Sequence, residues 1–229
     1  MSIWGKIIGG AAGFFCAVNA ARLDPALQVI LLEKTGKLLS KVRISGGGRC
    51  NLTHACFDRE EMSRNYPRGQ RFVKKAFHQF FTADTIQWFE ERGVAVKTEP
   101  DGRMFPASDS SESIINCLLK ELNRYKVDVR MNAEVVSLQK KDNLFTLHIR
   151  NGRTIEAEYV CVAAGGYPKS SMFDWLKETG HVIESPVPSL FTFNIPDHPI
   201  TGLMGVSVSA ATVKISGMKL EETAPLLIT

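Results

Sequence analysis

A glycine-rich turn near the start of the chain limits what the first thirty residues can fold into. The mostly apolar run Ile3–Ile8 leads into the turn Gly9–Gly13, and Ala11–Leu23 has apolar side chains at helical spacing. Asp24-Pro25 ends this helix, and Gln28–Leu32 is a second apolar run, typical of a strand buried on both faces. The pattern predicts a βαβ unit, whose two strands must be parallel.

The same turn is typical of a dinucleotide-binding fold. Glu33 follows Gly13 by 20 residues, at the end of the second predicted strand. In such folds the glycines let the backbone approach a pyrophosphate at the helix N-terminus, and the acid accepts hydrogen bonds from ribose hydroxyls. The pattern GxGxxG requires glycine at position 8, where this chain has Ile8. Either one glycine has been lost from a Gly-Gly-Gly-Ala-Ala-Gly run or the turn is built differently, and weaker phosphate binding is expected. Alternatively, the glycines only let a helix pack on a strand.

The middle of the chain mixes an irregular stretch with helical patterns. The stretch 34–70 lacks periodicity and is too long for an ordinary connection, so we expect a functional or disordered loop. Helical spacing returns at Phe72–Phe81, Ala83–Arg92 and Ser110–Tyr125. A brief strand is expected at Val94–Thr98.

The later segments alternate apolar and polar residues, as strands do. Four of them form a predicted antiparallel meander: Val127–Met131, Glu134–Gln139, Leu144–Arg150 and Thr154–Ala157. Tyr159–Ala163 is continuously apolar and is expected to return to the central parallel sheet. Val206–Ile215 alternates like a strand of another module. We therefore predict an α/β chain, with a Rossmann-like domain over 1–186 that has a parallel central sheet and a small antiparallel meander. Residues 187–229 would begin a second, β-rich domain.

A second glycine segment lies in the irregular stretch. Three successive glycines can present backbone N–H groups, while Lys41 and Arg49 add positive charge, which suits a phosphate or the polar edge of a flavin. It is not a Walker loop, because no Gly-Lys-Ser/Thr closes it. The alternative is a flexible surface loop. The candidate binding residues here are Lys41, Ser45, Gly46, Gly47, Gly48, Arg49, Cys50 and Asn51.

Together with the first turn, Ser45–Asn51 resembles a segment of the BaiN/RdsA family of NAD(P)- and FAD-dependent oxidoreductases, also called YhiN-like flavoproteins. The likeness continues at Asn65–Gly69, Asp101–Pro106 and Ala163–Gly166 and spans essentially the whole chain. It implies a reductase in which flavin takes a hydride from NAD(P)H and delivers it to an activated carbon–carbon double bond. The substrate classes implied are bile-acid-type enones and a uracil ring in large ribosomal RNA.

The resemblance also implies site residues. Besides the second glycine segment, FAD would contact Gly9, Gly10, Ala11, Ala12, Gly13, Glu33, Lys34, Val135, Ala164, Gly165 and Gly166, with Val136 as the alternative to Val135. Arg103 and Phe105 are candidate substrate residues, unless this pair only anchors a loop. The catalytic side chains stay unidentified, and no catalytic triad is expected, because the flavin ring itself stores the hydride. The chain ends at Thr229, whereas family members continue well beyond this length, so we expect FAD to be harder to hold.

The charge of the chain permits an anionic ligand without marking a dedicated nucleic-acid binder. The formal net charge of +4 and the isoelectric point near 8.8 are mild. Basic side chains crowd one segment, at Arg64, Arg68, Arg71, Lys74 and Lys75. This segment is either a solvated face or an RNA contact. An RNA-binding module without turnover is therefore one alternative function, and a truncated, inactive fragment is another.

The cysteines and histidines argue against a disulfide scaffold or a metal centre. Five cysteines include no CxxC pair, so we expect most to be reduced and buried. Whether Cys50 is only a buried, reduced cysteine is left open, because it lies in the second glycine segment. His54 and His78 are isolated, which predicts no metal site. No apolar run approaches the roughly 20 residues needed to span a bilayer, so no membrane association and a cytoplasmic location are the default expectations.

Overall fold

The computed structural model describes residues 3–167, 169–187 and 194–228, which fall into two compact units. The first unit is Met1–Glu184 and the second is Ser185–Thr229. Their division lies two residues before the predicted domain boundary at 186, and the assignment of these units as domains stays a prediction. The predicted segments that include residues 1–2, 168, 188–193 or 229 lie partly outside the described residues.

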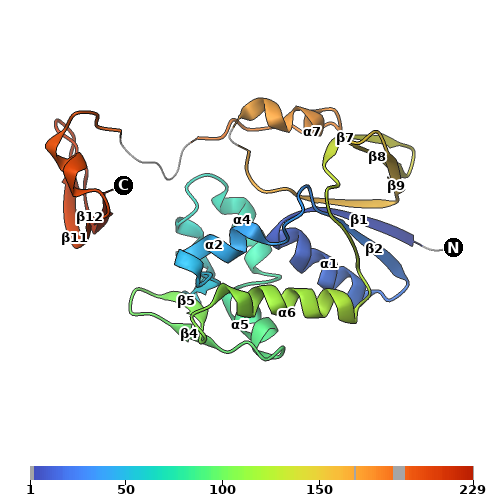
Figure 1. The fold of residues 1–229 in the computed structure, drawn as a ribbon, viewed down its shortest axis with the longest axis horizontal. Coiled ribbons are helices and arrows are strands. Elements are labelled where there is room, and N and C mark those ends of the chain that lie inside the picture. Colours follow the sequence, from blue (N-terminus) through green and yellow to red (C-terminus); the bar gives the residue numbers. More distant parts are fainter. Residues whose placement is uncertain (1–2, 168, 188–193, 229) are drawn as a thin grey trace. The chain divides into compact units, whose positions relative to one another are not determined.

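A four-stranded parallel sheet organises the first unit (Figure 1). Its strand order is β10-β1-β2-β6, and every neighbouring pair is parallel. The strands are β1 (Ile3–Gly9), β2 (Leu27–Leu32), β6 (Asp128–Arg130) and β10 (Tyr159–Ala163). Helix α1 (Ala11–Leu23) connects β1 to β2. The predicted βαβ unit, the return of Tyr159–Ala163 to the sheet and the α/β class are confirmed.

The sheet separates two hydrophobic cores (Figure 1). On one face, Val29 and Leu31 pack with side chains of α1 and of α6 (Ser111–Arg124). On the other face, Ile30 and Leu32 pack under the meander. The meander is antiparallel and comprises β7 (Val135–Lys141), β8 (Leu144–Ile149) and β9 (Thr154–Ala157). Strand β2 is thus buried on both faces, as its unbroken apolar run predicts.

The prediction that Val127–Met131 belongs to the meander is wrong. Asp128–Arg130 is β6, and it pairs in parallel with β2 at the edge of the central sheet. An edge strand is half-buried and alternates like a meander strand, so periodicity does not reveal its partner. Helix α6 precedes β6 and provides the crossover that a parallel pair requires.

The stretch 34–70 is more regular than predicted. It contains α2 (Ser40–Gly48), β3 (Thr53–His54) and α3 (Arg59–Arg64), and α4 (Gln70–Phe77) begins at its end. Helix α2 is interrupted, because Ser45, Gly46 and Gly47 have non-helical backbone angles. The helix predicted over 72–81 begins and ends earlier than expected, because α4 starts at Gln70 and stops at Phe77. Helix α5 (Thr82–Glu90) follows it.

Strand β3 belongs to a small antiparallel sheet, whose strand order is β3-β5-β4. Strand β4 is Val96–Thr98, shorter than predicted, and β5 is Arg103–Pro106. The first unit ends with a 3-10 turn at Ser170–Phe173 and the short helix α7 (Asp174–Lys177).

The second unit is built around one antiparallel pair, β11 (Ser207–Lys214) and β12 (Glu221–Leu227). A 3-10 turn at Pro199–Leu203 precedes them. Strand β11 covers most of the strand predicted at 206–215. Among the described residues of the whole chain, no helix is long and apolar enough to cross a membrane.

Candidate functional site

The first glycine turn lies where β1 ends and α1 begins. Gly9 has φ +136°, and a Cβ atom built on it would lie 1.9 Å from the carbonyl oxygen of Ala163 in β10. Only glycine fits there, because both the backbone angle and the close approach exclude a side chain. A Cβ built on Gly10 meets nothing within 4 Å, so space is open in front of the helix N-terminus. A Cβ built on Gly13 would lie 3.4 Å from Ile7 Cγ2, which is an ordinary contact distance.

Ile8 does not disrupt this turn. Its side chain is buried and packs with Ile30 and Leu32 in the core under the meander. The left-handed backbone angle falls on Gly9 instead.

The end of β10 and helix α2 meet beside the first turn. Gly9 pairs with Ala163, so the following residues Ala164, Gly165 and Gly166 continue from the same edge of the sheet. A Cβ built on Gly165 would lie 3.8 Å from Lys41 Nζ, which extends from α2. A Cβ built on Gly166 meets nothing within 4 Å. Three segments distant in sequence therefore converge at the carboxyl ends of parallel strands, which is where such sheets bind ligands.

Glu33 lies at this same edge, directly after β2. Its backbone N–H donates to the Arg130 carbonyl at 2.9 Å, and its carbonyl accepts from the Ala133 N–H at 2.9 Å. Its carboxylate accepts hydrogen bonds from the backbone N–H (2.9 Å) and the hydroxyl (3.0 Å) of Thr35. Sequence reasoning does not single out Thr35, although its position two residues after Glu33 is the short spacing at which such bonds form.

Lys34 and Val135 lie beside Glu33 through the segment that precedes β7. Lys34 Nζ is 3.6 Å from Glu134, which also pairs with Arg150. The hydrogen bond from Arg150, helped by the charge of Lys34, holds the pKa of Glu134 below its ordinary value. Lys34 is exposed, and Val135 is half-buried at the start of the meander. The structure therefore brings these two predicted residues to the edge that carries Glu33.

At the first glycine of the second segment, Gly46, protein atoms occupy the space that a side chain would need, although the glycine itself is exposed. A Cβ built on Gly46, where φ is +56°, would lie 2.9 Å from the Asn51 nitrogen and 2.9 Å from Phe105 Cε1. Ser45 Oγ donates a hydrogen bond to the Val42 carbonyl oxygen at 2.8 Å, which stabilises the backbone where helix α2 is interrupted. A Cβ built on Gly47 meets nothing within 4 Å. Gly46 is thus required by packing, whereas the backbone at Gly47 is accessible.

Arg49 is committed to other protein groups. Its guanidinium lies 4.0 Å above the Phe105 ring. It forms ion pairs with Glu99 and with Asp109, the latter at 3.7 Å. Its charge is therefore largely neutralised within the protein, and its main role in this structure is to hold the turn between β4 and β5 against α2.

Phe105 is fully buried, which favours the anchoring interpretation over contact with a substrate. Arg103 is exposed and pairs with Asp101 at 2.7 Å. Substrate contact by Arg103 stays a prediction.

Cys50 and Asn51 close the segment on the small sheet. Cys50 is buried with φ +62°, and burial raises the pKa of its thiol although a hydrogen bond with Ser45 opposes this. A thiol with a raised pKa stays protonated at neutral pH, so Cys50 is a packing group and a poor nucleophile. The Asn51 amide, oriented to donate, reaches the carbonyl oxygens of Thr53 (2.9 Å) and Met104 (3.2 Å).

His54 lies next to this segment and contacts other groups of the protein. His54 packs on Gly102, and its Nε2 lies 3.2 Å from the Asp101 carbonyl oxygen. Within the described residues there is no group of three or more His, Cys, Asp or Glu side chains that could hold a metal ion.

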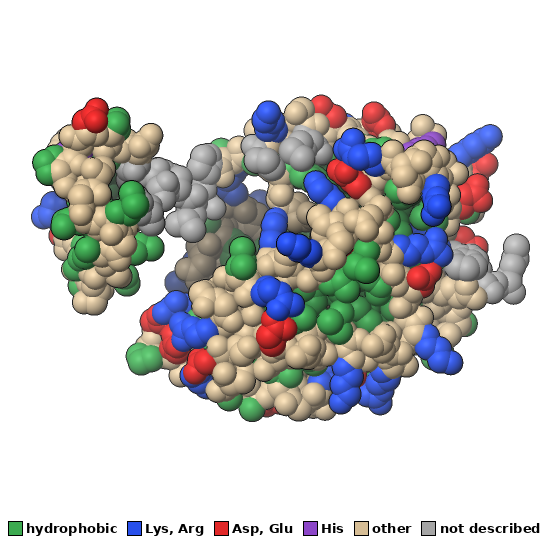
Figure 2. All heavy atoms as spheres, viewed as in Figure 1, with side chains coloured by type: hydrophobic (Ala, Val, Ile, Leu, Met, Phe, Trp, Pro, Cys, Tyr) green, Lys and Arg blue, Asp and Glu red, His purple; other side chains and the backbone are tan. Residues whose placement is uncertain are grey.

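The basic segment of α3 and α4 is partly neutralised. Lys74 pairs with Glu60, and Arg68 lies 3.9 Å from Glu184. These two ion pairs favour a solvated face over a concentrated RNA-binding patch. On the face of the first unit that Figure 2 shows, Lys and Arg side chains likewise lie among Asp and Glu side chains.

Comparison with known proteins gives a family and two informative relatives. A 3-dehydro-bile acid Δ(4,6)-reductase from Clostridium scindens is 29% identical over 98% of this chain and 56% of the relative. A ribosomal RNA dihydrouridine synthase from Escherichia coli is 34% identical over 70% of this chain and 38% of the relative. The chain thus spans about half, or less, of the length of these curated relatives.

A solved structure supports the fold. Escherichia coli quinol fumarate reductase FrdA superposes with a TM-score of 0.52 at 18% identity, over 72% of this chain and 33% of that chain. The model of the HI0933-like protein Rossmann domain matches residues 6–226, nearly the full chain. The chain belongs to the HI0933-like Rossmann family, in agreement with the BaiN/RdsA resemblance.

Proposed function

We propose that this chain is the FAD-binding part of an FAD-dependent oxidoreductase that uses NAD(P)H as electron donor. One observation carries the proposal: the first glycine turn, Lys41, Gly165 and Glu33 converge at one edge of a parallel sheet, with open space in front of Gly10. An extended dinucleotide needs this combination of an accessible helix N-terminus, a nearby cation and an acid at the end of the next strand.

The residues divide the binding between them. The backbone N–H groups of Ala11, Ala12 and Gly13 would donate to the pyrophosphate, and Lys41 would offset its charge. The Glu33 carboxylate would exchange its hydrogen bonds from Thr35 for ribose hydroxyls. The backbone at Val135 would meet the adenine. Bound flavin would accept and pass on the hydride, while the chain orients it.

The relatives suggest the substrate class. One is named as a reductase of a bile acid and the other as a synthase of dihydrouridine in ribosomal RNA. These names support reduction of an activated carbon–carbon double bond, either in an enone-type small molecule or in a uracil ring. Both relatives are enzymes by name, which disfavours an RNA-binding module without turnover.

The visible spectrum of the purified chain after incubation with FAD tests the cofactor. We expect a protein-bound flavin band, which Gly10→Val and Glu33→Gln both weaken strongly. Gly202→Val and Glu90→Gln are the controls, because Gly202 is also open and without positive φ, and Glu90 is an exposed acid away from the glycine turns. A folded chain that retains no flavin, or variants that bind flavin as well as the parent chain, would overturn the proposal.

A further inference from the structure

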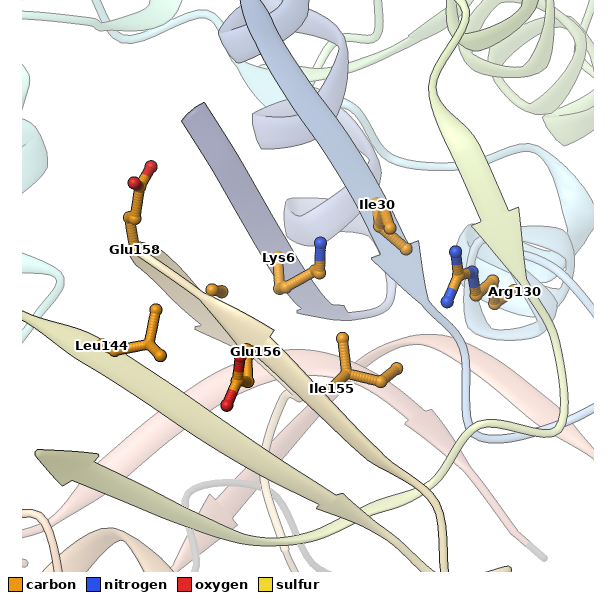
Figure 3. A pocket seen from close by; sticks show the side chains of 8 residues that line it. Lys6, Ile30, Arg130, Leu144, Ile155, Glu156 and Glu158 are labelled. Carbon is orange, nitrogen blue, oxygen red and sulfur yellow. The ribbon is translucent and has the colours of Figure 1, made fainter. Parts of the chain in front are cut away.

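Two cysteines from distant parts of the chain lie on the same face of the central sheet. In β1, the side chain of Lys6 lies on the meander face, in a pocket that Ile155 also lines (Figure 3). The next residue, Ile7, therefore faces helix α1, because side chains along a strand alternate between the two faces. Cys161 of β10 is directly beside Ile7 in the parallel register. It packs against the hydrophobic core on that face, so its thiol points toward α1.

Helix α1 brings Cys16 to the same place. A Cβ atom built on Gly13 would lie 3.6 Å from the Ala163 Cβ, and disulfides have Cβ atoms roughly 3.5–4.5 Å apart. Cys16 lies about one helical turn, roughly 4.5 Å, after Gly13. Cys161 lies roughly 6.6 Å before Ala163 along β10 and on the same face. Because α1 runs back from the end of β1 to the start of β2, both steps lead in the same direction, and the two cysteines lie opposite each other.

The two thiols form a hydrogen bond with each other. This bond, donated by Cys16, lowers the pKa of Cys161, while burial partly opposes the shift. The thiolate is the form of cysteine that reacts with oxidants, and a second thiol beside it can complete a disulfide. Both cysteines are half-buried. The other three cysteines of the chain are buried: Cys50, Cys56 and Cys117.

We propose that Cys16 and Cys161 form a site of reversible oxidation by hydroperoxides, at which the two thiols become a disulfide. The Cys161 thiolate attacks one oxygen of hydrogen peroxide, and the O–O bond breaks. Cys161 becomes a sulfenic acid, and the departing hydroxide takes up the proton that the Cys161 thiol had released, giving water. The Cys16 sulfur then attacks the Cys161 sulfur, and the S–O bond breaks. The hydroxide leaves with the Cys16 proton as a second water, so the two thiols supply both electrons that reduce the peroxide.

The position of Cys16 decides whether this oxidation is reversible. A sulfenic acid without a neighbouring thiol is open to further oxidation to a sulfinic acid, which thiol reductants do not reverse. Cys16 intercepts the sulfenic acid on Cys161, and the resulting disulfide can be reduced again by a dithiol. The inference does not depend on flavin binding, because neither cysteine is among the residues assigned to the cofactor.

Peptide mapping of the full chain tests the assignment after treatment with hydrogen peroxide and alkylation of the remaining thiols. Under non-reducing conditions we expect the peptides that contain Cys16 and Cys161 to be joined, and dithiothreitol to separate them. The three buried cysteines should stay as thiols. A map in which these two peptides are not joined, or in which Cys161 carries only sulfinic acid, would overturn the proposal.

Cys16→Ala separates the two chemical steps. Dimedone, which reacts with sulfenic acids, should label Cys161 at least about tenfold more in this variant than in the parent chain, because no thiol remains to displace the hydroxide. Cys117→Ala is the matched control: it removes another thiol from the core on the same face of the sheet and should leave the labelling at the parent level. Equal labelling of Cys161 in Cys16→Ala and the parent chain would contradict the role of Cys16. The peptide map of the parent chain decides the proposal even if a variant does not fold.

Discussion

The two glycine turns of this chain look alike in sequence and differ in what the glycines do. Around Gly10 the space is open and the nearby cation, Lys41, is exposed. Around Gly46 the space is filled by Phe105 and Asn51, and the nearby cation, Arg49, is paired with acids. The comparison shows that two similar runs of glycines have different surroundings, open space at Gly10 and protein atoms at Gly46. Only the neighbours of each glycine distinguish the two surroundings.

The largest effect is expected from Gly9→Ala. The new Cβ would lie 1.9 Å from the Ala163 carbonyl oxygen at a backbone angle unsuited to alanine. We expect the free energy of unfolding to drop by more than about 4 kcal/mol, as for other severe backbone clashes. Urea denaturation measures this, with Gly13→Ala as the control that should change it by less than about 1 kcal/mol, because its Cβ has ordinary contacts. Equal losses in both variants would contradict the close-approach interpretation.

Gly46→Ala should lower the free energy of unfolding by less, about 2 kcal/mol. One of the two atoms that obstruct the new Cβ belongs to the edge of the Phe105 ring, which is a side chain and not backbone. The double variant Gly46→Ala/Phe105→Leu should lose less than the sum of its single variants, since the smaller side chain relieves the contact. Additive losses in the denaturation experiment would show that Gly46 is not required by Phe105.

Lys41→Met tests whether the lysine beside the first glycine turn contacts the cofactor. Lys41 is exposed, so we expect no change in the unfolding midpoint, but about tenfold weaker FAD binding in a fluorescence titration, roughly 1.4 kcal/mol. Lys37→Met, at another exposed lysine outside the converging edge, is the control. If both variants bind FAD equally well, Lys41 does not contact the cofactor.

The smallest effect concerns Cys161 in β10, behind the first turn. A hydrogen bond from the Cys16 thiol in α1 lowers the pKa of Cys161, while burial partly opposes this. Its alkylation rate should rise with pH through a midpoint below the ordinary value of about 8.5. In Cys16→Ala that midpoint should move upward. Iodoacetamide labelling followed by mass spectrometry measures it, and an unmoved midpoint would exclude the hydrogen bond as the cause.

The sequence alone predicted the elements whose pattern is local. The βαβ unit follows from two apolar runs, a glycine turn and an alanine-rich helix. The strand at Tyr159–Ala163 follows from its unbroken apolar character, although β10 lies at the edge of the sheet and keeps Tyr159 and Val162 exposed. The partner of β6 was not predictable in this way, because Val129 alternates with Asp128 and Arg130 in either sheet.

What the sequence by itself determined is the family and the parallel βαβ core, and it also named the candidate residues for binding a dinucleotide. Only the tertiary structure decided which of them face open space: Gly10 does, whereas Phe105 is buried and Arg49 is neutralised. It also placed Cys16 beside Cys161, a pair of thiols that no motif marks. The physical reason is that accessibility and charge compensation depend on contacts between residues far apart in the chain, which local spacing does not encode.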